Sequence, residues 1–268
     1  DVVVELLDAR IPAASANPML REIIGDKPRV VALNKRDLAD ETMTRRWLEH
    51  FRAKKIPAVA LDSVSGKGMK ELLTLIEREA KYRTERLVSK GVAARKARVM
   101  ILGIPNVGKS SLINRLAGAA KAKTADKPGV TRAKQWIRIG ADVDLLDTPG
   151  ILWPKFEDPR VGLKLAFTGA VNDEIYDLES VAHLLLATLR RDHQERLQER
   201  FKFKEALPET TEGLMDAIGR KRGCLLKGGR IDFEKVQHIL LAEFRMGKFG
   251  KISLDVPPTE AAEEVDDS

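Results

Sequence analysis

"GIPNVGKSS", residues 103–111, is the most informative stretch of this chain, because it fits the phosphate-binding pattern G-x-x-x-x-G-K-[ST]. The apolar run "RVMIL" precedes it and "SLINRLAG" follows it, which predicts a strand, a loop and a helix in that order. Glycines at 103 and 108 permit a tight turn whose backbone N–H groups surround a β-phosphate at the positive end of the helix. The stretch therefore predicts a nucleotide-binding P-loop.

The residues of this loop are expected to divide the phosphate contacts among them. Lys109 should bridge the β- and γ-phosphates, which makes it a candidate catalytic residue, and Ser110 should ligate Mg²⁺. Ser111 should lie near the α-phosphate. The other predicted nucleotide-binding residues of the loop are Asn106, Val107 and Gly108.

"NKRD", residues 34–37, closes the apolar run "RVVAL" and predicts which base is bound. In an open α/β sheet, ligands bind at the carboxyl ends of the strands. Asp37 can accept the adjacent N1–H and N2–H₂ donors that only guanine presents, while Asn34 reads the O6/N7 side and Lys35 lies over the ring. Adenine would leave the carboxylate unpaired. These residues, with Arg36, predict a site for GTP and GDP.

"DSVSGKG", residues 62–68, closes the next apolar run, "PAVALD". By itself this cluster is an ordinary turn. Its place one strand after "NKRD" favours a second guanine contact, in which backbone N–H groups around Asp62 and Ser63 bond O6.

The pattern D-x-x-G occurs three times, at Asp126, Asp147 and Asp216, and only Asp147 ends an apolar run downstream of the P-loop. We therefore assign Asp147 to Mg²⁺, through water, and the Gly150 N–H to the γ-phosphate. Between these motifs, Thr131 in "KPGVTRAKQW" could close over Mg²⁺ and the γ-phosphate. Thr131 and Gly150 are candidate catalytic residues, and the predicted metal ligands are Ser110, Thr131 and Asp147.

Apolar runs alternate with helix-like stretches up to about residue 170, which predicts a doubly wound α/β domain with a parallel sheet. The guanine motifs precede the P-loop, the reverse of the usual GTPase order, so we expect a circularly permuted GTPase domain over 1–170. Helical periodicity then predicts a small all-helical domain over 171–258. The acidic end, 259–268, predicts a disordered tail.

The chain has 268 residues, 43% hydrophobic and 32% charged, and no run long and apolar enough for a membrane span. A single cysteine, Cys224, favours the cytoplasm. The net charge of +7 makes a polyanionic partner plausible. Basic residues gather in 78–98, where a solvated helix and a nucleic-acid face remain equal alternatives.

The motif order, together with "DARIP" at 8–12 and "NP" at 17–18, resembles the circularly permuted ribosome-assembly GTPases. "DTPGILWPKFED" at 147–158 and "DAIGRKRGCLLKGG" at 216–229 are similar to the bacterial ribosome biogenesis GTPase A (YlqF-like) group. The resemblance implies a protein that assists a late step of large (50S) subunit assembly. It would bind the precursor's rRNA and ribosomal proteins in the GTP state and leave after hydrolysis. For the oligomeric state, a monomer is the default expectation.

The resemblance also implies an RNA-binding role for the helical domain, consistent with its basic residues Lys221, Arg222, Lys227 and Arg230. Asn106 matches a P-loop asparagine that accompanies potassium stimulation in related GTPases, so K⁺ is a candidate second cation.

Ile151 stands where Ras-like enzymes place a water-orienting glutamine, so intrinsic hydrolysis should be slow. The resemblance implies that a histidine upstream of the first strand serves instead, and we expect this sequence to begin after that segment. The alternative is a nucleotide-gated RNA-binding scaffold with little hydrolysis. Ribosome-stimulated GTP turnover distinguishes the two.

Overall fold

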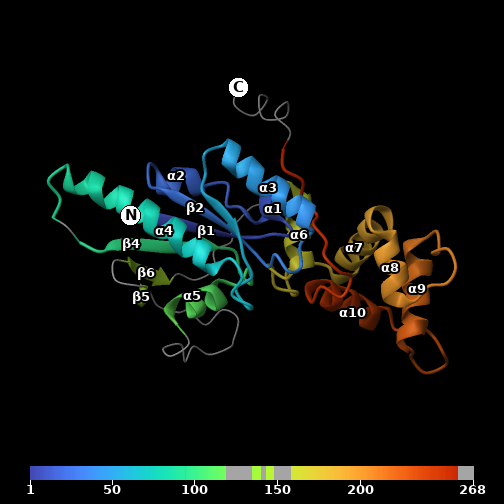
Figure 1. Ribbon diagram of the computed structural model, residues 1–268. Helices are drawn as coiled ribbons and strands as arrows, with labels where there is room; N and C mark the ends of the chain where they lie inside the picture. The colour runs from blue at the N-terminus through green and yellow to red at the C-terminus, as the bar shows by residue number, and fades with distance from the viewer. Residues whose placement is uncertain (94, 119–134, 140–142, 148–157, 259–268) are drawn as a thin grey trace. The chain divides into compact units, whose positions relative to one another are not determined.

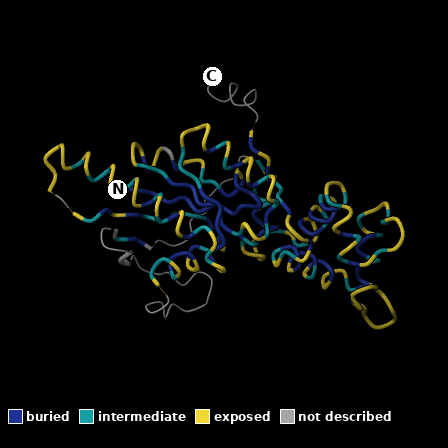
Figure 2. Tube along the Cα trace, in the orientation of Figure 1, coloured by how far each residue is buried: buried dark blue, intermediate teal, exposed yellow. Residues whose placement is uncertain are grey.

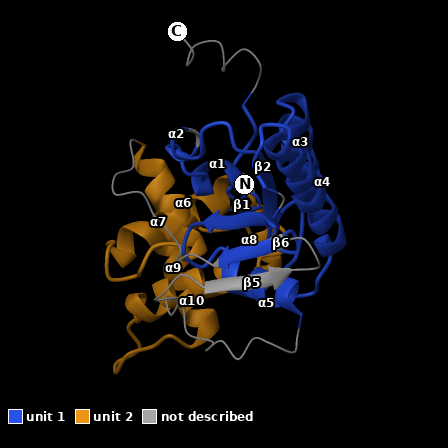
Figure 3. Cartoon of the chain, turned by 90° about the vertical axis from the view of Figure 1, so that its left-hand side faces the viewer, with its two compact units in different colours: residues 1–155, 253–268 blue, residues 156–252 orange. Residues whose placement is uncertain are grey.

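The computed structural model describes residues 1–93, 95–118, 135–139, 143–147 and 158–258 (Figure 1). The chain divides into two compact units (Figure 3). Unit 1 comprises Asp1–Lys155 and Ser253–Ser268, and unit 2 comprises Phe156–Ile252.

Unit 1 is built on one sheet with the strand order β3-β2-β1-β4-β6-β5. Neighbouring strands are parallel except for β5, which runs antiparallel to β6. The strands are β1 (Val2–Asp8), β2 (Arg29–Asn34), β3 (Ala58–Ala60), β4 (Ala97–Gly103), β5 (Gln135–Ile139) and β6 (Val143–Asp147). The predicted doubly wound α/β domain is confirmed.

The strand order reverses direction at β1, which pairs with β2 on one side and with β4 on the other. At such a switch point the connections leave in opposite directions and open a crevice at the carboxyl ends of the strands. The strands that carry the guanine motifs come first in the chain, and β4 delivers the P-loop afterwards. The circular permutation expected from the motif order is therefore a property of the fold.

The helices of unit 1 are α1 (Pro12–Ser15), α2 (Leu20–Ile24), α3 (Glu41–Ala53), α4 (Met69–Val88) and α5 (Lys109–Ala117). Every residue of the central strand β1 is buried, as Figure 2 shows for the middle of the sheet. Leu7 and Leu33 pack with Trp47 and Phe51 of α3. Burial of such side chains stabilises the folded protein by about 1.5–3 kcal/mol each. This packing holds α3 against the strands β1 and β2, and β2 ends in the "NKRD" motif.

Unit 2 is helical in its described residues, with α6 (Pro159–Thr168), α7 (Leu178–Asp192), α8 (Gln194–Phe201), α9 (Thr211–Arg222) and α10 (Phe233–Arg245). Four of these helices begin at a side chain that accepts a backbone N–H of the first turn: Asp158, Asp177, Thr210 and Asp232. Such caps satisfy donors that the helix leaves free. Leucines of α7 and α10 supply much of the buried core.

The boundary between the units lies earlier than the expected one at 170/171, because α6 belongs with the other helices. The rings of Phe167 and Phe244 meet edge to face at 6.4 Å. Arg245 Nη2 donates to the Ala166 carbonyl at 2.9 Å, and its guanidinium also bonds Asp173. The buried Phe167 near the end of α6 has its ring partner in α10, and the sequence around α6 does not show this pairing.

The expected helical domain also ends earlier than 258, because residues 253–258 return to unit 1. The Leu254 N–H donates to the Arg10 carbonyl at 2.7 Å. Asp255 accepts the Ala14 N–H at 2.8 Å through its carboxylate and the Trp47 indole N–H at 3.3 Å through its carbonyl. This short segment is held by one backbone–backbone hydrogen bond and two side-chain hydrogen bonds to residues far away in the sequence. The expected disordered tail, 259–268, lies outside the described residues.

Candidate guanine-nucleotide site

The P-loop follows β4 and leads into α5, with Ile104 and Val107 buried. A Cβ at Gly103 would lie 2.8 Å from the Leu6 carbonyl oxygen and 2.9 Å from Val107 Cγ1. Only glycine therefore lets the loop leave the sheet this close to β1. The turn then passes through left-handed conformations at Asn106 (φ 56°) and Gly108 (φ 97°).

The first turn of α5 presents the groups expected to hold phosphate. Its backbone N–H groups have no acceptor within the helix, so they can donate to phosphate oxygens. Lys109 is buried, 7% exposed, whereas Ser110 and Ser111 are exposed. These residues fit a nucleotide whose Mg²⁺ contacts the Ser110 hydroxyl.

The remaining predicted phosphate and metal ligands are only partly covered by the structure. Asp147 ends β6 as predicted, but its side chain lies outside the described residues, as do Thr131 and Gly150. Within the described residues, no group of three or more His, Cys, Asp and Glu side chains forms a metal site. A GTPase Mg²⁺ site depends on Ser, Thr and phosphate oxygens, so such a cluster is not required.

Asn34 joins three motifs that lie far apart in the sequence. Its side-chain Nδ2 donates to the Val107 carbonyl of the P-loop at 2.7 Å and to Ser63 Oγ at 3.1 Å. Its Oδ1 accepts the Ser63 N–H at 3.0 Å. Because both amide hydrogens are engaged within the protein, the structure gives Asn34 a positioning role, and the expected contact with guanine O6/N7 stays a prediction.

The turn at 62–68, which we call the base loop, has its backbone donors engaged within the protein. The Asp62 N–H donates to the Lys67 carbonyl at 3.0 Å, and the Ser63 N–H donates to Asn34. The Asp62 carboxylate accepts the Val64 N–H at 2.8 Å. Burial raises the pKa of Asp62, but hydrogen bonds from Ser65 and Val64 outweigh it and lower that pKa. Contact of the Asp62 or Ser63 N–H with guanine O6 stays a prediction and would require these bonds to exchange.

Asp37, the predicted reader of guanine, is exposed, and the structure records no hydrogen bond or ion pair between it and another described residue. Its neighbour Arg36 is fixed, because its backbone N–H donates to the Leu61 carbonyl at 3.2 Å and its Nη1 to the Ala60 carbonyl at 3.3 Å. The backbone that carries Asp37 is therefore attached to the end of β3, while the carboxylate is available to a base.

Lys35 is anchored by a buried carboxylate that the sequence analysis did not assign to the site. Lys35 has a left-handed backbone (φ 62°), and its Nζ lies 3.1 Å from Asp8 Oδ2. Asp8 ends β1 directly beside Asn34, and it also accepts Arg10 Nη2 at 2.7 Å and Nε at 3.0 Å. The sequence signal was an acidic residue at the end of an apolar strand, in the "DARIP" stretch.

The charges of this cluster alter its protonation. Burial by itself raises the pKa of Asp8, but Arg10 and Lys35 outweigh it and hold that pKa well below its usual range. Burial lowers the pKa of Lys35, and the Asp8 carboxylate opposes part of this shift. Asp8 therefore stays ionised and holds the Lys35 ammonium in place.

We expect Asp8→Asn to destabilise the protein by about 3–5 kcal/mol at pH 7, because it leaves buried cations without their carboxylate. The folded-state pKa of Asp8 is lowered, so its contribution is fully present above the ordinary carboxyl pKa of about 4 and is lost progressively as the pH falls from there through the lowered folded-state pKa. Urea unfolding at pH 7 and at pH 2 would measure the free energy of unfolding of both proteins on the two sides of this transition. Asp26→Asn, at an exposed aspartate, is the matched control. If Asp8→Asn lowered the free energy of unfolding by the same amount at both pH values, the ion-pair role of Asp8 would be contradicted.

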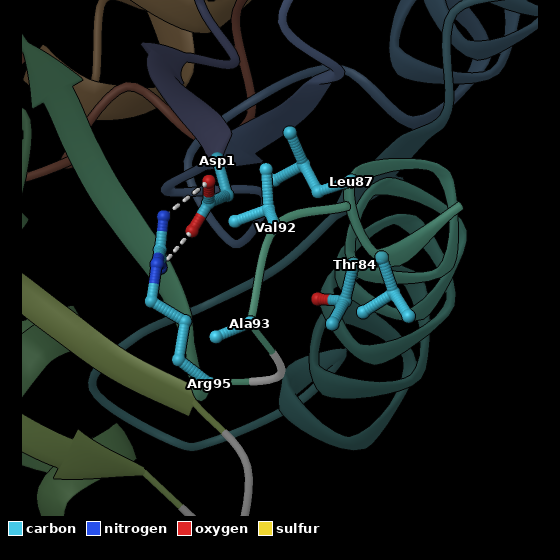
Figure 4. A pocket seen from close by; sticks show the side chains of 7 residues that line it. Asp1, Thr84, Leu87, Val92, Ala93 and Arg95 are labelled. Atoms are coloured by element: carbon cyan, nitrogen blue, oxygen red, sulfur yellow. Dashed lines mark hydrogen bonds and ion pairs between the residues drawn. The ribbon is translucent and has the colours of Figure 1, made fainter. Parts of the chain in front are cut away.

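A small cavity elsewhere in unit 1 lies at the opposite edge of the sheet. It lies beside the amino ends of β1 and β4, where the Asp1 carboxylate pairs with Arg95 at 2.7 Å (Figure 4). Its volume of about 10 Å³ has room for about one water molecule. Its position and size exclude it as the nucleotide site.

The sheet edge thus brings the P-loop, "NKRD" and the base loop together at a topological switch point, in permuted order. Fold and motifs define a circularly permuted P-loop GTPase, which binds GTP and GDP and hydrolyses GTP. None of the helices in the described part of the chain has the length and apolar character to cross a membrane.

Comparison with known proteins agrees with this class. Residues 98–212 match the family model described as 50S ribosome-binding GTPase. "Ribosome biogenesis GTPase A" of Bacillus cereus is 49% identical over 100% of this chain and 90% of its own length. "Mitochondrial ribosome-associated GTPase 1" of Mus musculus is 32% identical over 95% of this chain and 83% of its own. The chain belongs to the ribosome biogenesis GTPase A family.

Solved structures support the same assignment. The GDP-bound structure of TM YlqF has a TM-score of 0.68 and 28% identity, covering 96% of this chain and 94% of that one. GNP-bound YlqF from T. maritima gives a TM-score of 0.65 at 28% identity, covering 96% and 92%.

Proposed function

We propose that this protein is a cytoplasmic GTPase switch that assists a late step of large ribosomal subunit assembly. Its GTP form binds the precursor particle, and hydrolysis releases it with GDP. The observation that carries the proposal is the guanine-nucleotide edge, assembled in permuted order, in a chain that belongs to the ribosome biogenesis GTPase A family. The family model that matches it is described as ribosome-binding.

The roles of the nucleotide-site residues are part of this proposal. Ser110, Thr131 and Asp147 would hold Mg²⁺, and the Gly150 N–H would contact the γ-phosphate. The bound ion supplies positive charge that neutralises the β- and γ-phosphates. Lys109, buried at the start of α5, adds a fixed positive charge at the same place. K⁺ near Asn106 is proposed as a second cation.

Hydrolysis needs a group that orients water, and Ile151 cannot do so. We therefore propose that turnover is slow in the free protein and is stimulated by the docked subunit. This dependence would couple release to arrival at the correct particle.

Two of the four basic residues proposed for RNA binding in unit 2 have partners within the protein. Arg222 is engaged internally, because its Nη2 lies 2.6 Å from Glu243 Oε1, and Arg200 binds the same carboxylate at 2.7 Å. Lys221 Nζ donates to the Lys202 carbonyl at 3.1 Å and lies over the Phe203 ring. Removal of the Arg222 side chain would therefore disturb the fold as well as any RNA contact, since Glu243 is buried.

Two other basic residues are better placed for phosphate. Lys227 and Arg230 are exposed and flank two glycines, Gly228 and Gly229, in a tight turn where the Leu226 N–H donates to the Arg230 carbonyl at 2.8 Å. Neither side chain has a hydrogen-bond or ion-pair partner among the described residues. We assign the RNA contact of unit 2 to this turn.

GTP turnover with and without purified large-subunit precursors, in potassium and in sodium buffer, tests the proposed function. We expect clear stimulation by the particle. GTP binding without stimulation would contradict the switch and favour the nucleotide-gated scaffold.

The RNA contact is tested separately by replacing Lys227 and Arg230 with Gln together. Salt-dependent co-sedimentation with precursor particles should show a slope reduced by about two, since each phosphate contact contributes about one unit. The control replaces the exposed pair Arg45 and Arg46 of α3 with Gln. An unaltered slope in the turn variant would place the contact elsewhere, with the basic stretch 78–98 next to be examined.

A further inference from the structure

An arginine that belongs to neither guanine motif donates hydrogen bonds to the base loop. Arg115 lies in the last turn of α5, the helix that the P-loop begins. Its Nε donates to the Ser63 carbonyl at 3.4 Å, and its Nη2 donates to the Val64 carbonyl. One side chain thus joins two consecutive carbonyl groups of the base loop.

The same guanidinium covers the middle of the base loop. A Cβ at Gly66 would lie 3.5 Å from Arg115 Cζ, at ordinary contact distance. Gly66 is left-handed (φ 87°), so the loop turns directly beneath the arginine. Arg115 therefore contacts the loop through hydrogen bonds and through packing.

Within the base loop, the Val64 N–H donates to the Asp62 carboxylate at 2.8 Å, but the Val64 side chain does not pack against the protein. The Val64 side chain is 76% exposed and contributes almost no burial. Asn34 holds the Ser63 N–H at the entry to the loop, from the β2 side. The loop is thus attached to β2 through the Ser63 N–H and to α5 through the Ser63 and Val64 carbonyl groups.

We propose that Arg115 is a positioning residue for guanine recognition. By holding the Ser63 and Val64 carbonyls against α5, it keeps the base loop in place at the guanine edge of the sheet. It also joins the loop to the helix that carries the phosphate site, so that base and phosphate contacts form and break together. Its loss speeds nucleotide dissociation and weakens the preference for guanine.

The chemistry of arginine suits this task. Its planar guanidinium presents several donors in a fixed fork, whereas lysine presents a compact charge on a flexible stem. A cation in the last turn of a helix is also favourable for the helix itself. That simpler role would affect stability alone, so the test must measure nucleotide selectivity.

The experiment compares Arg115→Gln and Arg115→Lys with the wild type. Arg52→Gln, at an exposed arginine of α3, is the matched control. We expect GDP to dissociate about tenfold faster from Arg115→Gln, the effect of losing hydrogen bonds from a charged donor, and Arg115→Lys to fall between. The affinity for ADP, measured by competition, should not change, so the preference for GDP over ADP should fall by the same factor.

Three outcomes would overturn the proposal: an unchanged GDP dissociation rate, an equal loss for GDP and ADP, or a lowered melting temperature with selectivity intact. If Arg115→Gln does not fold, Arg115→Lys carries the test. The proposal depends on the base-loop assignment, and the wild type controls for it. A wild-type protein with no preference for GDP over ADP would contradict that assignment rather than the role of Arg115.

Discussion

Asp37→Asn should lower the affinity for GDP by about a hundredfold or more and should create affinity for xanthosine diphosphate. The Asp37 carboxylate is exposed beside a fixed backbone, so its two oxygens can accept both donors of guanine. Asparagine replaces one acceptor with a donor, which faces the guanine amino group and leaves it unpaired. Xanthine carries an oxygen at that position, which accepts the new donor.

Competition titrations against a fluorescent guanine nucleotide would measure both affinities. Glu49→Gln, at an exposed carboxylate of α3, is the control and should bind GDP as the wild type does. Loss of guanine affinity with no gain for xanthine would show that Asp37 supports the loop without reading the base.

Gly108→Ala should abolish tight nucleotide binding and destabilise unit 1. An added Cβ would lie 2.2 Å from Asn34 Nδ2, the group that binds both the P-loop and the base loop. The glycine also has a φ of 97°, which L-residues rarely adopt, at a cost of about 1–3 kcal/mol. The substitution therefore separates the phosphate motif from the guanine motifs.

The control for this prediction is Gly91→Ala. Gly91 has a similar φ of 84°, but nothing lies within 4 Å of an added Cβ. It should lose stability through the backbone alone and retain nucleotide affinity. Calorimetric titration with GDP and thermal unfolding of both variants separate the two effects. Equal nucleotide affinity in Gly108→Ala and Gly91→Ala would show that the contact with Asn34 is unimportant.

Much of the nucleotide edge could be predicted because each motif is short and local. The P-loop stretch begins at Gly103, the last residue of β4, and "NKRD" begins at the last residue of β2, as their sequences indicate. An apolar run followed by glycines or polar groups defines a strand and its end without knowledge of the rest of the chain. The order of these motifs then predicted the permuted sheet.

The positioning contacts could not be predicted in this way. Asn34 reaches Val107 across 73 residues, and Arg115 reaches Val64 across 51. Sequence alone also left Arg222 as a candidate RNA contact, although it binds the buried Glu243. Such pairings depend on which strands and helices become neighbours.

The class of nucleotide site and the permuted order of its motifs follow from the amino-acid sequence, because local hydrogen-bonding geometry requires particular residues at fixed spacing. Tertiary structure alone decided the supporting contacts: Asp8 beneath Lys35, Asn34 between three motifs, α6 in unit 2 and residues 253–258 on unit 1. Those contacts form only when the packing of sheet and helices brings distant residues together. A local sequence pattern does not specify which distant residues become neighbours.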